Sequence, residues 1–386
     1  MIAWGDIYKV AAAMAPLYFA LGLGYGSVRW WRFFTPEQCG AINTLVVHFS
    51  MPFFTFDFLS RADPYTMNYR VLGADAVSKA LLAMLAVAAW ARCCCGGGGA
   101  SKAGGARAQS SWPITGFSLA AFNNTLVVGV PLLHAMYGEW ARDLIVQIAV
   151  VQALVWFPLL LLGFELRKAW VGGGVSRGGG GDAGGRVEPA VSSSPAAAAE
   201  KNADVEMNAA EADAPAGGGG GGVRLWPTVR TVGLKLAGNP NVYASVVGVV
   251  WACIAYRWGL SMPGIVTGSL QVMSKTGTGM SMFSMGLFMA QQEKIIGCGA
   301  GLAALGMALR FVAGPLATLV GAAAFGLRGD VLRFAIIQAA LPQSIASFVY
   351  AKEYGLHADV LSTAVIFGTL VSLPVLIAYY AVLGIV

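Results

Sequence analysis

The chain has 386 residues, of which 57% are apolar and only 11% are charged. Soluble domains carry about 25% charged residues, so this composition excludes an ordinary soluble globular protein. The formal net charge of +6 is not gathered into a basic run, and nucleic-acid binding is therefore not expected.

Apolar stretches of about 20 residues recur along the chain, the length needed to cross about 30 Å of hydrocarbon. The sequence therefore predicts an all-α polytopic membrane protein with ten spans. These lie near 7–27, 38–58, 71–91, 112–134, 144–164, 239–259, 263–290, 299–322, 332–350 and 360–384. The first stretch lacks a basic leader and a small-residue cleavage signal, so we expect a retained helix rather than a signal peptide.

A stretch of different composition divides the spans. Residues 171–222 are rich in Gly, Ala, Ser and acids and contain few large apolar side chains, so they cannot build a core. We predict a disordered loop over 166–235 between two membrane halves, 1–165 and 236–386. Lys and Arg are enriched in this loop, which by the positive-inside rule lies in the cytosol, with both termini outside it or in an organelle lumen.

Among the charged residues inside or at the ends of spans, four stand out. Asp75 and Lys79 lie four apart on one face of the third span. Charges in hydrocarbon usually pair or line a cavity, so a structural salt bridge and a role in transport both stay open. Lys275 is expected to extend its charged end toward the membrane surface. Arg310 is expected either to do the same or to pack against other helices.

The fourth and ninth spans each contain a proline, Pro131 and Pro342. Proline removes one backbone hydrogen bond from a helix and clashes with the preceding turn. Both spans continue into Tyr-Gly-x-x-Ala followed by Asp, and each half has five spans. The pattern predicts inverted repeats with broken helices, whose half-helix amino termini would form a site for an anion at the midplane.

Amide side chains near these prolines are candidate ligands. Asn124 lies about two turns before Pro131 and is expected to donate to a bound anion, whereas Asn123 is expected to bond a neighbouring helix. Gln152 in the fifth span is a candidate donor, and Gln343 directly follows the second proline.

The sequence offers no enzymatic signature. The three histidines have no metal spacing, and neither HExxH nor a Walker sequence is present. Cys93, Cys94 and Cys95 also lack zinc spacing. We interpret them as free reduced cysteines, with palmitoylation as the alternative.

Four long segments resemble the plant PIN-FORMED auxin efflux carriers, namely NNTLVVGVPLLHAMYG, GNPNVYASVVGVVW, MSMFSMGLFMA and FAIIQAALPQSIASFVYAKEYG. The resemblance covers both membrane halves. It implies a fold like that of bile-acid transporters and sodium/proton antiporters, in which broken helices 4 and 9 cross. It also implies a homodimer in the lipid bilayer that exports the indole-3-acetate anion and needs no cofactor.

The resemblance also assigns residues. It implies that Asn124 contacts the auxin carboxylate at the crossing, with Pro131 and Pro342 as the crossover prolines. The other expected substrate-binding residues are Asn241, Gln152, Thr55 and Gln343, and Asp75 and Lys79 match a supporting charged pair.

Three departures from the family pattern bear on affinity. Phe157 stands where relatives often have Tyr, so a hydroxyl is lost. Thr55 replaces a usual Ser and keeps the hydroxyl. Asp57 replaces a usual His and adds a negative charge near the expected anion site.

The short central loop resembles that of endoplasmic-reticulum members, so we expect that membrane, with the plasma membrane as the alternative. The resulting hypothesis is a secondary transporter that exports the auxin anion from the cytosol by elevator-like alternating access, as a uniporter. An ion-coupled carrier of another organic anion remains an alternative. So does a membrane receptor or scaffold that signals through 171–222.

Overall fold

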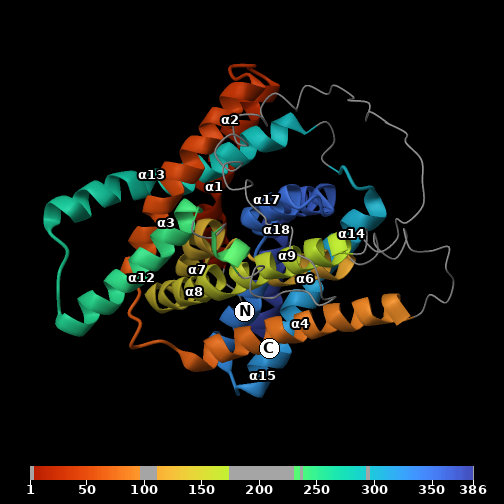
Figure 1. The fold of residues 1–386 in the computed structure, drawn as a ribbon. Helices are drawn as coiled ribbons and strands as arrows, with labels where there is room; N and C mark the ends of the chain where they lie inside the picture. Colours follow the sequence, from red (N-terminus) through yellow and green to blue (C-terminus); the bar gives the residue numbers. More distant parts are fainter. Residues whose placement is uncertain (1–3, 96–110, 174–229, 235–237, 293–295, 386) are drawn as a thin grey trace.

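The computed structural model describes residues 4–95, 111–173, 230–234, 238–292 and 296–385, which form helices joined by short connections (Figure 1). The first half contains α1 (Trp4–Arg29), α2 (Pro36–Leu45), η1 (Val46–Ser50), α3 (Met51–Ser60), α4 (Tyr69–Cys95), α6 (Trp112–Ala121), η3 (Thr125–Gly129), α7 (Val130–Tyr137), α8 (Glu139–Val151), η4 (Gln152–Trp156) and α9 (Phe157–Gly173). The second half contains α12 (Pro240–Trp258), α13 (Gly264–Gln291), α14 (Ala300–Ala308), η7 (Leu309–Ala313), α15 (Gly314–Ala324), α16 (Gly329–Ala339), α17 (Ile345–Glu353) and α18 (Ala358–Ile385).

The prediction of an all-α membrane protein is confirmed. Six helices in the described part of the chain are long and apolar enough to cross a bilayer. They are Tyr8–Arg29, Pro36–Ser60, Tyr69–Ala89, Glu139–Lys168, Ala300–Ala324 and Ala358–Gly384. The side chains of the predicted cysteine cluster, and nearly all of the predicted loop 171–222, lie outside the described residues.

In the part of the chain that the structure describes, four helices contain a five-residue π-helical turn, and each turn ends two residues before a proline. The segments are η1, η3, η4 and η7, and the prolines are Pro52, Pro131, Pro158 and Pro315. In each case the residue before the proline donates its N–H to the carbonyl five residues earlier. The wider turn accommodates a residue that has no N–H and whose ring crowds the preceding turn. Pro131 therefore continues a helix, and the prediction that it breaks the fourth span is wrong.

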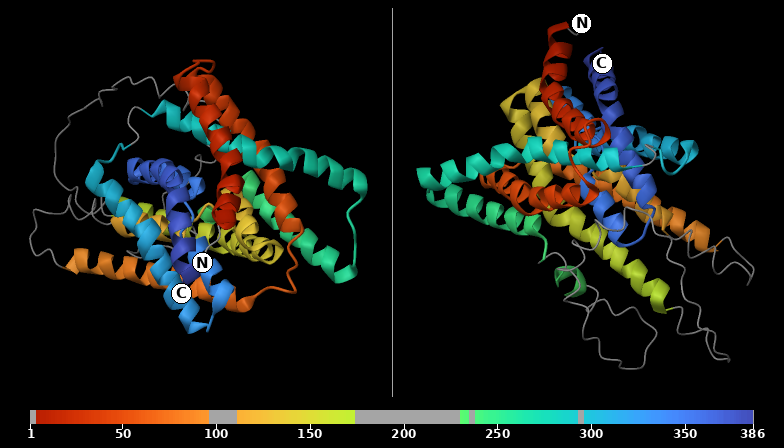
Figure 2. Two further views of the ribbon diagram at one scale, coloured as in Figure 1. Left: turned by 180° about the vertical axis from the view of Figure 1, so that it is seen from behind. Right: turned by 90° about the horizontal axis from the view of Figure 1, so that it is seen from above.

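The helices pack as two groups (Figures 1 and 2). In the first group α13 lies against α1 and α3, and α3 lies against α12. In the second group α4 packs on α6 and α15, α15 packs on α16, and α18 packs on α14 and α17. Each group combines helices from both halves of the chain. The start of α1 and the end of α18 lie at the same end of the molecule (Figure 2).

Two glycines allow α1 and α13 to touch through their backbones. A Cβ atom at Gly24 would collide with the carbonyl oxygen of Phe283, and one at Gly286 would collide with that of Leu21. Small residues are the usual means of close helix approach in membranes. The contact ties the first helix of one half to the second half.

We expect Gly24→Val to separate these helices, because a rigid backbone carbonyl leaves no room for the new side chain. Overpacking of this kind costs about 1–3 kcal/mol or more, so the melting temperature in detergent should fall. Gly22→Val is the matched control, since a Cβ at Gly22 has no neighbour within 4 Å. Equal melting temperatures for the two variants would contradict the assigned contact.

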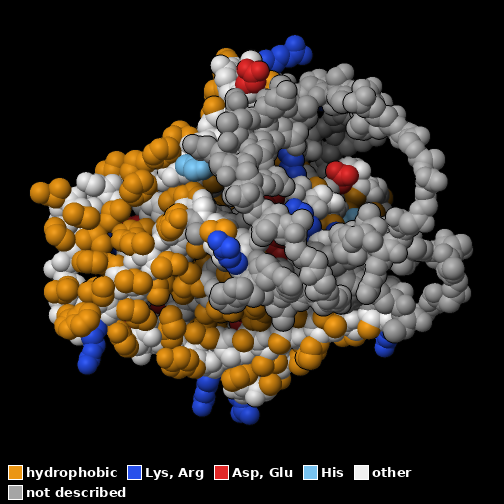
Figure 3. Space-filling model, viewed as in Figure 1, with side chains coloured by type: hydrophobic (Ala, Val, Ile, Leu, Met, Phe, Trp, Pro, Cys, Tyr) orange, Lys and Arg blue, Asp and Glu red, His pale blue; other side chains and the backbone are white. Residues whose placement is uncertain are grey.

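The outer surface of the molecule is apolar over α12 and α13 (Figure 3). Val246, Val247 and Val250 on α12, and Ile265 and Val272 on α13, are exposed. Charged side chains in the same view lie at the lower margin of this apolar area and elsewhere in the central and upper parts of the molecule. An apolar belt of this kind suits a surface that faces lipid chains rather than water.

Candidate functional site

The chain leaves helical geometry inside the fourth and the ninth predicted spans, and the two interruptions meet. Asn124 donates its N–H to the carbonyl of Pro342 at 2.9 Å, and Ser344 donates its N–H to the carbonyl of Phe122 at 3.1 Å. These bonds form an antiparallel bridge between Asn123 and Gln343. Because each interruption satisfies the backbone groups of the other, both are stable within an apolar environment.

The interruptions have different local causes. In the first, Phe122 is extended (φ −103°, ψ 113°) and two asparagines follow it. Asn favours such positions because its side chain competes with the backbone for hydrogen bonds. In the second, Pro342 itself lies in the break, and it disfavours helical geometry in the residue before it. Pro342 is thus placed as predicted, whereas the first break is formed without a proline.

Asn123 is fully bonded at this crossing. Its Nδ2 donates to the carbonyl of Gln338 at 2.6 Å and to Gln338 Oε1 at 3.0 Å. Its Oδ1 accepts a bond from Arg310 at 2.6 Å. The prediction that Asn123 bonds a neighbouring helix is confirmed, since Gln338 belongs to α16.

Gln152 holds the same backbone from the other side. Its Nε2 donates to the carbonyl of Asn123 at 2.8 Å, and the N–H of Asn123 points back to Gln152 Oε1 at 3.4 Å. Both polar atoms of this side chain therefore serve the first break. Gln152 supports the shape of the crossing, and its role as a donor to a ligand stays a prediction.

Arg310 does not snorkel; it is completely buried. It projects from the π-helical turn η7, and its Nη1 donates at 3.2 Å to each of the carbonyls of Leu119, Ala120 and Phe122. Its Nη2 donates to Asn123 and to the carbonyl of Ala339. A guanidinium has five N–H donors in one plane, so a single side chain reaches the carbonyl ends of α6 and α16 together.

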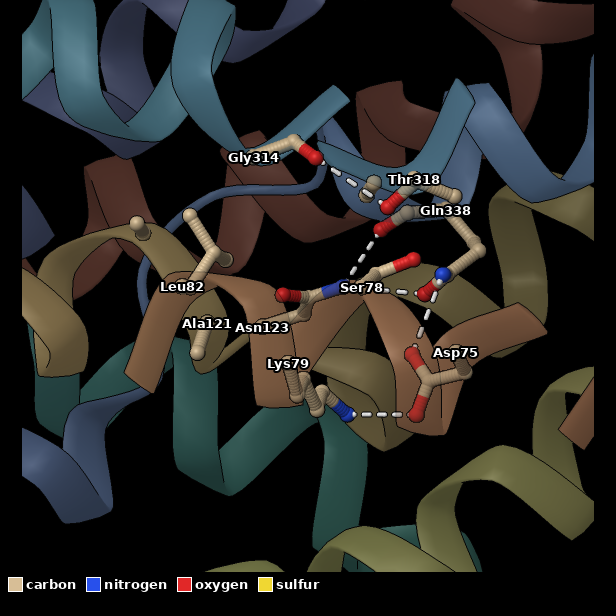
Figure 4. A pocket seen from close by; sticks show the side chains of 11 residues that line it. Asp75, Ser78, Lys79, Leu82, Ala121, Asn123, Gly314, Thr318 and Gln338 are labelled. Carbon is tan, nitrogen blue, oxygen red and sulfur yellow. Dashed lines mark hydrogen bonds and ion pairs between the residues drawn. The ribbon is translucent and has the colours of Figure 1, made fainter. Parts of the chain in front are cut away.

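Asp75 and Lys79 form a buried ion pair beside this network (Figure 4). Lys79 Nζ lies 2.8 Å from Asp75 Oδ2, and Gln338 Nε2 makes a long contact of 3.5 Å with Asp75 Oδ1. Figure 4 shows Asp75, Asn123 and Gln338 turned toward one another. The cavity that they line has a volume of about 10 Å³, enough for about one water molecule and too small for an organic substrate.

Asn124 differs from its neighbour. It is 8% exposed, and its carboxamide forms no hydrogen bond with any other residue in the described ranges. Asn124 and Ser344 immediately precede the half-helices η3–α7 and α17, and neither start is capped by a side chain. Uncapped helix amino termini have unpaired N–H groups and partial positive charge, so an anion can be bound here.

A larger cavity of about 520 Å³ lies between α3 and the segment formed by η3 and α7. On one side it is lined by α3, with Phe54 and Asp57. On the other side it is lined by η3 and α7, with Leu126, Val130 and Pro131. Its lining combines apolar side chains with charged ones such as Arg142 and Asp143, and its size suits a small organic ligand.

The charge that Asp57 adds to this cavity is balanced. Its Oδ1 accepts two bonds from Arg61, at 2.9 and 2.6 Å, and its Oδ2 accepts one from Ser274 at 2.9 Å. The pairing offsets the repulsion that a free carboxylate would exert on an anion.

A family model described as membrane transport protein matches residues 9–380. A probable auxin efflux carrier component 5c of Oryza sativa subsp. japonica is 76% identical over the full length of both chains. Auxin efflux carrier component 5 of Arabidopsis thaliana is 50% identical over 99% of each chain. The chain belongs to the PIN-FORMED family. Within it, the component 5 relatives identify a short-loop, multi-pass membrane transport protein rather than an enzyme.

The remaining predicted residues of this PIN-FORMED chain lie in varied surroundings. Gln343 is completely buried and donates to the carbonyl of Ser118 and to Ser347, while its Oε1 has no hydrogen-bond partner among the described residues. Thr55 is buried on α3. Asn241 is half-buried at the start of α12, and its Oδ1 is unpartnered. Their roles toward a ligand stay predictions.

Sequence reasoning missed two members of the PIN-FORMED crossing, Arg310 as a central residue and Gln338 altogether. The sequence contained a signal for Gln338, because its amide stands inside the apolar run FAIIQAALP. A polar side chain within an apolar span is the same criterion that selected Gln152. Phe157, where a hydroxyl is lost, stacks on Phe122 with ring centroids 4.9 Å apart. An aromatic ring thus packs directly against the first break.

Proposed function

We propose that this PIN-FORMED protein exports the indole-3-acetate anion from the cytosol. The observation that carries the proposal is the unbonded carboxamide of Asn124 between two uncapped helix amino termini. A carboxylate there would accept hydrogen bonds from an amide and from backbone N–H groups, and it would face partial positive charge. The names of the relatives, all auxin efflux carrier components, supply the substrate.

The arrangement of helices supports inverted repeats of five spans each. In such a repeat α1 corresponds to α12, and α2–α3 corresponds to α13. If the halves are related in this way, each contact between helices should recur between their counterparts. The contact of α1 with α13 has as its counterpart the contact of α12 with α3, and both contacts are present. Likewise, the packing of α4 on α6 becomes that of α15 on α16, which also touch.

We propose an elevator-like movement in which the second group of helices slides against the first. The cavity of about 520 Å³ supports this movement because one wall is α3 of the first group and the other is η3 and α7, which follow α6 of the second group in the chain. Its lining includes Arg61 and Asp63 in the connection after α3 and Arg142 in the first turn of α8, next to the connection from α7. These connections face away from the cytosol in the predicted topology, so the cavity corresponds to the release side of the membrane.

The decisive experiment is transport of radiolabelled indole-3-acetate by the purified protein in liposomes. We expect uptake that follows the membrane potential and is unchanged by sodium or proton gradients, because a uniporter needs only the charge of its own substrate. The methyl ester of indole-3-acetate is the matched control ligand and should not compete, since it lacks the anionic group. Sodium dependence with indifference to auxin would instead select the ion-coupled carrier.

The scaffold alternative makes a separate prediction. Deletion of 174–229 should leave transport intact if the membrane helices carry the function, and loss of transport in a folded deletion variant would favour a role for the loop.

We also propose a homodimer in the endoplasmic reticulum membrane, on the basis of the short central segment and the family. Co-fractionation with plasma-membrane markers would contradict the location. A mass in nanodiscs equal to one chain of 40.1 kDa would contradict the dimer.

A further inference from the structure

The buried charges near the crossing do not balance. Among the described residues the buried charged side chains are Asp75, Lys79, Glu165 and Arg310. Asp75 and Lys79 form an ion pair and cancel. Glu165 lies in the middle of α9, about two helical turns beyond Phe157, where Tyr354 donates to it at 2.6 Å. Arg310 thus remains as one formal positive charge, and arginine does not lose its proton in proteins.

The partners of Arg310 within the described ranges include no carboxylate. They are the carbonyls of Leu119, Ala120, Phe122 and Ala339, together with Asn123 Oδ1. Helix carboxyl ends carry a partial charge of about −0.5 each, and amino ends carry about +0.5. The two carboxyl ends that meet Arg310 offset its charge locally. The two amino ends near Asn124 and Ser344 are positive by the same amount, so the crossing as a whole retains the charge of Arg310.

We propose that Arg310 is the resident counter-charge for the transported anion. The centre of the empty carrier is then singly positive, and the centre of the carrier loaded with a monovalent carboxylate is neutral. This inference rests on the proposed function. It assigns the movement of charge through the membrane to the return of the empty carrier, whereas the loaded step moves no net charge.

The assignment explains how a carboxylate can enter an apolar centre. An unpaired ion in a low-dielectric interior is strongly disfavoured, and in many carriers a bound cation offsets that penalty. Here Arg310 is linked to the site through Asn123, the residue directly before Asn124. Arg310 is therefore a positioning residue that acts on the ligand through the crossing.

The test compares two fluxes of the wild-type protein in liposomes under a potential set by potassium and valinomycin. Net flux of labelled indole-3-acetate includes the empty return and should change by about threefold or more over 100 mV. Exchange with saturating anion on both sides uses only the loaded carrier and should not change. Exchange as voltage-sensitive as net flux would overturn the charge assignment alone. No flux of indole-3-acetate at all would overturn the proposed function.

Variants give a second readout. Arg310→Gln should make the loaded centre negative, so that exchange becomes voltage-sensitive and KM rises by about tenfold or more. Arg310→Lys keeps the charge and should keep exchange insensitive to voltage, although fewer carbonyls are reached. Arg333→Gln is the control, because Arg333 on α16 is paired with Asp330 at the surface. Voltage-insensitive exchange by a folded Arg310→Gln protein would contradict the proposal, and the wild-type comparison holds even if that variant does not fold.

Discussion

Replacement of Asn124 by Asp is expected to abolish auxin export while the protein stays folded. The two side chains have the same shape, but Asp places a negative charge where the substrate carboxylate would bind. Repulsion between two like charges in a partly buried site amounts to several kcal/mol, which raises KM beyond the measurable range. The measurement is uptake of labelled indole-3-acetate into liposomes.

Alanine variants separate binding from folding at the same crossing. Asn124→Ala should raise KM by about tenfold and leave the melting temperature nearly unchanged, because this carboxamide has no bond to another described residue. Asn123→Ala should lower the melting temperature, since it removes bonds to Arg310 and Gln338. If Asn124→Ala transports auxin like the wild type, the assigned binding site is wrong.

Removal of either member of the Asp75–Lys79 pair is expected to destabilise the protein by about 3–5 kcal/mol. The remaining charge would be buried without its partner, since both residues are less than 5% exposed. The double variant Asp75→Leu with Lys79→Met should recover most of this loss. Chemical unfolding in mixed micelles measures the three free energies.

The same variants decide between the two interpretations of the pair. A stable double variant that transports at the wild-type rate would make the pair structural, and a stable one that does not transport would give the pair a role in the cycle. The surface pair of Arg333 and Asp330 is the control, because an exposed ion pair contributes about 0–1 kcal/mol.

Regular features of the fold were predictable because they depend on local composition. Hydrophobic length alone located the helices, and the rule against proline in a helix located the second break at Pro342. The same rule misplaced the first break. Pro131 is accommodated by the π-helical turn before it. The position of a proline in the sequence does not show whether the helix widens into a π-helical turn or breaks.

The centre of the site was harder to predict because it depends on contacts between distant residues. Arg310 meets carbonyls that precede it by about 190 residues, and those carbonyls are free only because two helices end beside it. Neither fact is visible in the sequence around Arg310, where an arginine in an apolar helix usually reaches toward the membrane surface. Asn124 was selected as a candidate because its amide stands inside an apolar span, and its role toward a ligand stays a prediction.

The bridge between the two breaks also bears on how the protein is made. The N–H of Asn124 and the carbonyl of Phe122 find their backbone partners in Pro342 and Ser344, which leave the ribosome more than 200 residues later. Until then the first five helices contain an interruption that hydrocarbon cannot satisfy. The first half is therefore an incomplete product during synthesis, and its final insertion waits for the second half to arrive.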